Sequence, residues 1–256
     1  MHARILPLIL AVTLTACAGD GKTKKSAVDI DPRETAESLY TAGKTDLDKG
    51  NYETAIESYG KLESRYPFGP YAQQAQLDTA FAHYKLDEPD AAIAAADQFI
   101  KLQPQHANVD YAYYIKGLAN FQRNASFLDR VFGKRLSDVD VTPLRQSFID
   151  FKLLLQRFPN SIYADDARQR MIYLRNQLAL HEYEIARFYA RKRADVAVVQ
   201  RLTSLIEQYD GADIIPRALV LLATTYDRLK LADAYNETLR VLEHNFPDQA
   251  GKVRRN

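Results

Sequence analysis

The 256-residue sequence has one cysteine, no tryptophan and only ten glycines. A single cysteine excludes an intrachain disulfide and a zinc site built from several cysteines. The scarcity of glycine argues against a turn-rich β fold and favours helices. No apolar run reaches the roughly 20 residues of a membrane-spanning helix. The net charge of +1 provides no overall basic surface, so nucleic acid is not an expected partner.

The N-terminus is typical of an exported lipoprotein. Residues 5–14 form an apolar run with the length of a secretory signal peptide core. The run ends in Leu-Thr-Ala followed by Cys17, which resembles the lipobox of bacterial lipoproteins. We therefore predict a signal peptide over 1–16 and a lipidated Cys17 whose acyl chains anchor the protein, each buried methylene contributing about 0.8 kcal/mol. The alternative is an ordinary signal peptide with an incidental cysteine.

The segment after the predicted cleavage site is polar. Ala18 follows the cysteine where aspartate would be a retention signal, and by analogy with lipoprotein sorting this favours the outer membrane. Residues 17–33 contain glycine, serine and lysine without an apolar period, which predicts a flexible tether between the lipid and the folded part. The protein is thus expected on the periplasmic face of the outer membrane, held there by lipid.

An internal repeat fills the remainder of the chain. Residues 66–75 and 158–167 share the pattern aromatic-Pro-x₃-Tyr-Ala-x₂-Ala. A proline that closes an apolar helix recurs with a basic period of 37 residues, for example from Pro67 to Pro104, although Asp210 replaces it once. A helical repeat of about 34 residues with a slightly long connection resembles the tetratricopeptide repeat.

Apolar residues before each of these positions recur at helical spacing, as in Tyr52, Ala55, Tyr59 and Leu62. The first helix of each unit carries a small residue that lets a neighbouring helix approach: Gly43, Ala80, Gly117, Ala186 and Ala223. The sequence therefore predicts an all-α fold, an α-solenoid of five tetratricopeptide-like helix pairs. These pairs are expected over 36–69, 73–106, 110–161, 179–212 and 216–249.

Two departures from the repeat divide the chain. Residues 123–143 interrupt the third pair and are expected to form a long loop. Residues 163–190 contain neither glycine nor proline and predict one long helix between the third and fourth units. We therefore expect N-terminal repeats 1–3 over 34–162, C-terminal repeats 4–5 with this long connecting helix over 163–250, and a short tail over 251–256.

The sequence contains no recognisable catalytic or cofactor motif. The histidines are scattered, and neither a zinc-binding pattern nor a phosphate-binding loop nor a nucleophile elbow occurs. Neighbouring acidic residues such as Asp165 and Asp166 fit a solvated helix face with ion pairs between successive turns. We expect no enzyme activity, no cofactor and no metal.

Aromatic residues and one arginine are the candidate binding residues. Tyr66, Phe68, Tyr71 and Tyr113 could line a groove that grips an extended peptide, because aromatic rings are anchors of low entropic cost. The alternative for each ring is packing between repeats. Arg201 lies beside the apolar stripe of its helix, where it could cover apolar surface or pair with a carboxylate of a partner.

Several strings resemble the BamD family, the outer-membrane lipoproteins of the β-barrel assembly machinery. They are Arg-Tyr-Pro-Phe-Gly-Pro-Tyr at 65–71, Gln-Leu-Asp at 76–78 and Val-Ala-Val-Val at 196–199. The resemblance implies a non-enzymatic scaffold whose C-terminal repeats bind the last BamA periplasmic domain, with Arg201 in a salt bridge. It also implies N-terminal repeats that receive unfolded outer-membrane protein substrates or accessory Bam lipoproteins. Asp210 departs from the usual proline of the family.

Two other classes of protein fit the sequence less well. A periplasmic repeat adaptor of the Tol–Pal type would carry an N-terminal coiled coil, whereas residues 18–33 have no heptads. A peptidoglycan enzyme built on a solenoid would need an added catalytic domain, and residues 34–250 leave no room for one.

Overall fold

The computed structural model of the protein describes residues 34–131 and 140–253. Several predicted features therefore lie wholly or partly outside the described residues. They are the signal peptide (1–16), the lipidated Cys17, the tether (17–33), part of the insertion (132–139) and the end of the tail (254–256).

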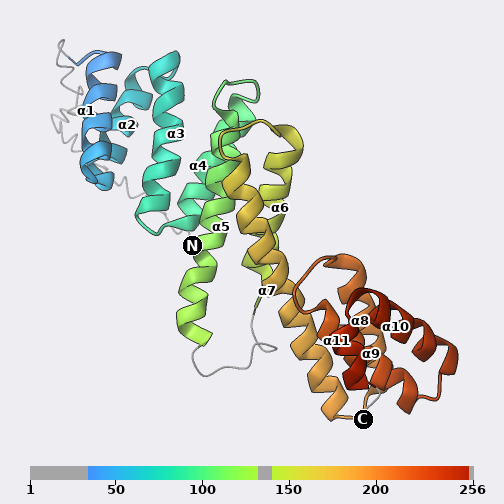
Figure 1. Ribbon diagram of the computed structural model, residues 1–256. Coiled ribbons are helices and arrows are strands. Elements are labelled where there is room, and N and C mark those ends of the chain that lie inside the picture. The colour runs from blue at the N-terminus through green and yellow to red at the C-terminus, as the bar shows by residue number, and fades with distance from the viewer. Residues whose placement is uncertain (1–33, 132–139, 254–256) are drawn as a thin grey trace, which may run out of the picture. The chain divides into compact units, whose positions relative to one another are not determined.

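Every regular element among the described residues is an α-helix, and the helices follow one another as pairs (Figure 1). All of these helices belong to one compact unit. The arrangement confirms the predicted α-solenoid of five tetratricopeptide-like pairs. The pairs are α1 (Ala36–Lys49) with α2 (Tyr52–Arg65), α3 (Pro70–Lys85) with α4 (Pro89–Leu102), α5 (Val109–Val131) with α6 (Thr142–Arg157), α7 (Ala164–Arg191) with α8 (Asp195–Gln208), and α9 (Ile215–Arg228) with α10 (Ala232–Asn245).

The small residues of the first helices are contact points between helices, as predicted. A Cβ atom added at Gly43 would lie 2.5 Å from Cε1 of Tyr59, and one added at Gly117 would lie 2.5 Å from Cε1 of Phe151. Both rings are completely buried. In these two pairs the second helix therefore places an aromatic ring directly over the backbone of the first. The alanines at the corresponding places of the other pairs are also completely buried: Ala80, Ala186 and Ala223.

The turn inside four of the five pairs has one backbone conformation in common. Gly50, Asp87, Arg193 and Lys230 have φ values of 83°, 60°, 58° and 57°. Each follows the first helix of its pair, where a left-handed residue ends a helix by satisfying its last carbonyl groups. Only Gly50 adopts this conformation without a steric penalty at Cβ. The turns within the pairs thus repeat along the chain, as the apolar stripes of the helices do.

The long helix predicted over 163–190 is present as α7, which runs for 28 residues. It packs against both α6 and α8. Buried residues recur along the whole helix, from Ala167 through Leu174 and Leu178 to Ala186. One continuous element therefore serves both the third and the fourth pair.

The prediction of a loop over 123–143 is wrong for its first residues. Residues 123–131 continue α5, and α6 already begins at Thr142. Arg123 forms an ion pair with Asp90 of the neighbouring helix pair, which holds this extension of α5 against the repeat before it. The inserted residues thus lengthen a helix before they connect it to the next one.

A short helix after the last pair was not predicted. α11 (Pro247–Val253) packs against α9 and α10 and buries Ala250 and Val253. It begins inside the predicted fifth pair and covers part of the expected tail. Because a terminal repeat has no neighbour to cover its apolar face, a packed end segment supplies that cover.

Candidate functional site

The predicted partner-binding arginine lies at a charged cluster on three helices. Arg201 of α8 donates from Nη1 to Oε2 of Glu182 on α7, at 2.9 Å. Nη2 of Arg145, on α6, lies 3.9 Å from the other carboxylate oxygen of Glu182, and its Nη1 donates to the hydroxyl of Tyr209 at 3.3 Å. The Arg201 side chain is 45% exposed, whereas that of Glu182 is 16% exposed.

The apolar stripe of α8 explains why Arg201 points to the surface. Val198, Leu202 and Leu205 are completely buried and fix the helix on α7 and α9. Arg201 comes one residue before Leu202 and so lies on the flank of this stripe. A guanidinium group has five N–H donors, so Glu182 orients the group while donors remain for a carboxylate of another molecule. A cavity of about 340 Å³, lined in part by Arg201 and Glu182, adjoins the pair.

The connection between α2 and α3 exposes two of the predicted groove residues. Phe68 is 90% exposed and Tyr66 is 37% exposed. Gly69, with a φ of 104°, turns the chain, and Pro70 then begins α3 at a position where a missing N–H costs no helical hydrogen bond. An aromatic side chain that is 90% exposed contributes almost nothing to the core, so Phe68 is available for an external contact.

Tyr71 has a packing role within the repeat. Its ring centroid lies 5.5 Å from that of Tyr40 on α1, and the side chain is half-buried against the N-terminal core. The corresponding tyrosine of the second motif, Tyr163, stacks on two rings of α5, with centroid distances of 5.1 Å to Tyr111 and 4.6 Å to Tyr114. The shared motif therefore places a tyrosine against the first helix of the preceding pair.

The assignment of Tyr113 to a peptide groove is corrected by its burial. Tyr113 is 5% exposed, and its ring packs 5.6 Å from that of Phe158. Nη1 of Arg157 donates to its hydroxyl at 2.8 Å. The structure does not bring Tyr113 together with Tyr66 and Phe68, and its ring is part of the core between α5 and α6.

Two buried aspartates form polar centres that the sequence did not indicate. Asp78 of α3 accepts hydrogen bonds from the hydroxyls of Tyr40 and Tyr59, each at 3.2 Å, and from Nε2 of Gln74 at 2.8 Å. Burial raises its pKa, and these hydrogen bonds oppose that change. Since all three donors are neutral side chains from the same pair or the preceding one, the centre ties repeats together and offers no activated nucleophile.

Asp150 of α6 is the second centre. It accepts from Nδ2 of Asn120 at 2.7 Å and from Nε2 of Gln146 at 3.2 Å, and Nζ of Lys116 lies 3.9 Å away. Burial raises the pKa of Asp150 as well, and its three neighbours reduce this increase without cancelling it.

Among the described residues no group of three or more histidine, cysteine and acidic side chains could hold a metal ion. None of the helices described is both long enough and apolar enough to cross a membrane.

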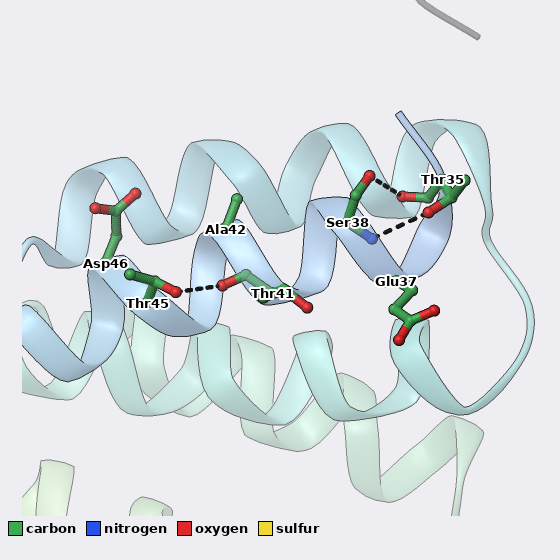
Figure 2. A pocket seen from close by; sticks show the side chains of 7 residues that line it. All are labelled: Thr35, Glu37, Ser38, Thr41, Ala42, Thr45 and Asp46. Carbon is green, nitrogen blue, oxygen red and sulfur yellow. Dashed lines mark hydrogen bonds between the residues drawn. The ribbon is translucent and has the colours of Figure 1, made fainter. Parts of the chain in front are cut away.

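A cavity of about 620 Å³ on the outer face of α1 is lined by Thr35 and by residues of α1 (Figure 2). Several of its hydroxyl groups form hydrogen bonds within the helix or at its start. The backbone N–H of Ser38 donates to Oγ1 of Thr35 at 3.1 Å, which caps the helix, and Oγ1 of Thr45 donates to the carbonyl of Thr41 at 2.8 Å. Glu37 and Asp46 add two carboxylates to the same lining.

Comparisons with known proteins agree on one family. The YfiO family model, described as an outer membrane lipoprotein, matches residues 32–242. The chain is 40% identical to "Outer membrane protein assembly factor BamD" of Neisseria meningitidis serogroup B over 247 residues, which cover 96% of this chain and 92% of that protein. It is 36% identical to the protein of the same name from Vibrio cholerae, with coverage of 86% and 91%.

The BamD of Haemophilus influenzae is 32% identical, with 93% of this chain and 88% of that protein covered. Among solved structures, a thermophilic TPR protein of Thermus thermophilus aligns with a TM-score of 0.38 and 15% identity over 86% of this chain and 97% of that one. That structural similarity is too low to support an inference.

Proposed function

The chain belongs to the BamD family of outer-membrane lipoproteins, and on this premise we propose that it is a non-enzymatic scaffold for the assembly of outer-membrane proteins. Its relatives carry the name of outer membrane protein assembly factors. Stacked helix pairs present extended surfaces along which several partners bind at once. In this role the protein holds BamA and an unfolded substrate close to each other at the membrane.

The C-terminal repeats bind BamA in this proposal, and Arg201 makes the central contact. The observation that carries it is the geometry of the guanidinium group, which is 45% exposed and held by Glu182 at 2.9 Å. An arginine that is oriented before binding loses little side-chain entropy when it pairs with a partner carboxylate. The pair with Glu182 thus prepares Arg201 for a charge-assisted contact with the last periplasmic domain of BamA.

The N-terminal repeats receive unfolded substrates or accessory Bam lipoproteins. Phe68 supports this part of the proposal, because an aromatic side chain that is 90% exposed beside Tyr66 offers an apolar anchor for an extended segment. Tyr71 fixes the base of this connection through its contact with Tyr40. Tyr113 is buried and is therefore not part of the proposed binding surface.

The proposal keeps the domain plan of the sequence. Residues 1–16 act as the signal peptide, and the tether over 17–33 joins the lipid on Cys17 to the repeats. Repeats 1–3 occupy 34–162, and repeats 4–5 with α7 as the connecting helix occupy 163–250. The acyl chains set the distance of the scaffold from the membrane, because three chains together anchor a protein durably.

The BamA contact is tested with Arg201→Glu. We expect this variant to lose co-purification of BamA from solubilised membranes, because it opposes a partner carboxylate with a like charge. Lys61→Glu, an exposed charge reversal on α2, serves as the control and should retain BamA. Circular dichroism must show the same helical content for both. Retained BamA in the Arg201 variant would refute the role assigned to this residue.

The anchor is tested with Cys17→Ser. Without the thiol no diacylglycerol can be attached, so the protein should move from the membrane fraction to the soluble periplasmic fraction. The fractionation is done in cells depleted of BamA, so that binding to BamA does not retain the variant at the membrane. Continued membrane association under these conditions would contradict lipidation at Cys17.

A further inference from the structure

A second cavity in the C-terminal repeats has a strongly basic rim. It measures about 500 Å³ and lies between α7 and α9. Tyr183, Ala190 and Leu221 contribute its less polar part. The rest of the lining consists of arginine side chains from α7, from the turn after it and from α9: Arg187, Arg191, Arg193 and Arg228. We call this cavity the arginine groove.

The ring of Tyr183 organises two guanidinium groups at the groove. Cζ of Arg217, on α9, lies 5.1 Å from the ring centroid, and Cζ of Arg187 lies 6.0 Å from it. Tyr183 itself is 7% exposed, so its position is fixed by the core. Cation–π contacts of this kind hold arginine side chains in place without neutralising their charge.

Only part of the positive charge at the groove is compensated from within the protein. Arg187 pairs with Glu184 at 2.8 Å. Both Nε and Nη2 of Arg228 donate to Oδ1 of Asp195, and these hydrogen bonds lower the pKa of Asp195.

The remaining arginines carry an excess of charge. In the part of the chain that the structure describes, Arg191, Arg193 and Arg217 form no ion pair with a carboxylate, and all three are exposed. Arg193 stands in the left-handed turn after α7, with a φ of 58°, which directs the chain from α7 into α8 along the groove. Arg191 and Arg193 therefore line the cavity without an ion pair to a carboxylate, and Arg217 lies next to it on the ring of Tyr183.

We propose that the arginine groove docks an acidic, extended segment of a partner protein, in which carboxylates alternate with apolar side chains. The guanidinium fork matches the geometry of a carboxylate and binds it with two parallel hydrogen bonds. Leu221 and Ala190 offer contact area for the apolar side chains in between. The groove shares no lining residue with the cavity at Arg201 and Glu182.

The shape of the groove favours a peptide over a lipid headgroup. A single phosphate would be bound by one cluster of donors, whereas the arginines that line the groove come from α7, from the turn after it and from α9. Charges distributed along a groove between two helices suit a ligand that carries several anionic groups in a row. The apolar base adds contacts that a headgroup lacks.

The test uses the full-length lipidated protein in detergent and a short fluorescent peptide of alternating glutamate and leucine, with binding followed by anisotropy. Combined Arg191→Glu and Arg193→Glu substitutions, both in the lining of the groove, should weaken binding about tenfold or more, since each replaces a charge-assisted contact by repulsion. Arg240→Glu, an exposed charge reversal on α10, is the matched control and should bind as the wild type does.

A second variant keeps the test decisive if the double substitution unfolds the protein. Ala190→Glu leaves every arginine in place and adds a carboxylate inside the groove, so it should also weaken peptide binding. Equal binding by a folded groove variant would overturn the proposal, and so would equal binding of a glutamine–leucine peptide. Displacement of the labelled peptide by short-chain phosphatidylglycerol at lower concentration than by unlabelled peptide would assign the groove to lipid instead.

Discussion

The contact between Gly117 and Phe151 allows a sharp test of how the helix pairs are held together. A Cβ atom at position 117 would lie 2.5 Å from Cε1 and 2.6 Å from Cδ1 of the Phe151 ring. The ring is completely buried in the core, so it has no free space into which to move. Gly117→Ala therefore forces either α5 and α6 apart or the ring into an unfavourable rotamer.

The change in the free energy of unfolding caused by Gly117→Ala is the sum of two opposing effects. Overpacking a well-packed core costs about 1–3 kcal/mol, whereas alanine in a helix is more favourable than glycine by about 1 kcal/mol. Gly60, in the interior of α2, isolates the second effect, because a Cβ atom there would have no neighbour within 4 Å. The difference in unfolding free energy between Gly117→Ala and Gly60→Ala is then the cost of the clash alone, about 1–3 kcal/mol.

Urea unfolding followed by circular dichroism measures both variants against the wild type. We expect Gly60→Ala to raise the free energy of unfolding and Gly117→Ala to lie below it by the amount given above. Phe151→Leu in the Gly117→Ala background should recover part of the loss, because it removes the ring that the new methyl group meets. Equal stability of the two alanine variants would refute the close packing of α5 and α6.

Two further predictions concern the turns and the alkaline range. Lys230→Gly should raise the free energy of unfolding by about 1 kcal/mol, because lysine is strained at a φ of 57° where glycine is not; an unchanged urea midpoint would contradict this. Burial, aided by the charge of Asp78, raises the pKa of Tyr40 from 10.0 to about 12. The folded state therefore keeps a proton that the unfolded state has lost, so this stabilisation is complete below pH 10 and disappears as the pH rises to 12. Tyr40→Phe should flatten that decline, and an equally steep decline in the variant would exclude Tyr40 as its source.

The sequence predicts the repeat architecture because the repeat is a periodic signal. Gly43 and Gly117 could be assigned to contact points from register alone, and the structure confirms both. α11 could not be predicted, since seven residues after Pro247 are too few to show a helical period. The beginning of the insertion breaks the register of the repeat and therefore predicts a loop, yet a break in register does not prevent a helix from continuing.

The contacts at the candidate sites could not be predicted from the sequence as well as the helices could. Tyr113 and Tyr114 are adjacent on α5, a helix with apolar residues on most of its faces, so periodicity could not tell the buried ring from the more exposed one. The motif that contains Tyr163 was visible, but its stacking on Tyr111 and Tyr114 depends on how α7 meets α5. Glu182 precedes Arg201 by 19 residues, and only the packing of α7 on α8 brings the two together.

The affinity of the isolated last periplasmic domain of BamA, measured by titration calorimetry, tests the proposed scaffold role most directly. Arg201→Glu should weaken binding by about thirtyfold or more, as expected for an interfacial charge pair that loses one partner. Glu182→Gln should weaken it less, because Arg201 keeps its charge and loses only its orientation. Wild-type affinity in the Arg201→Glu variant would contradict the account.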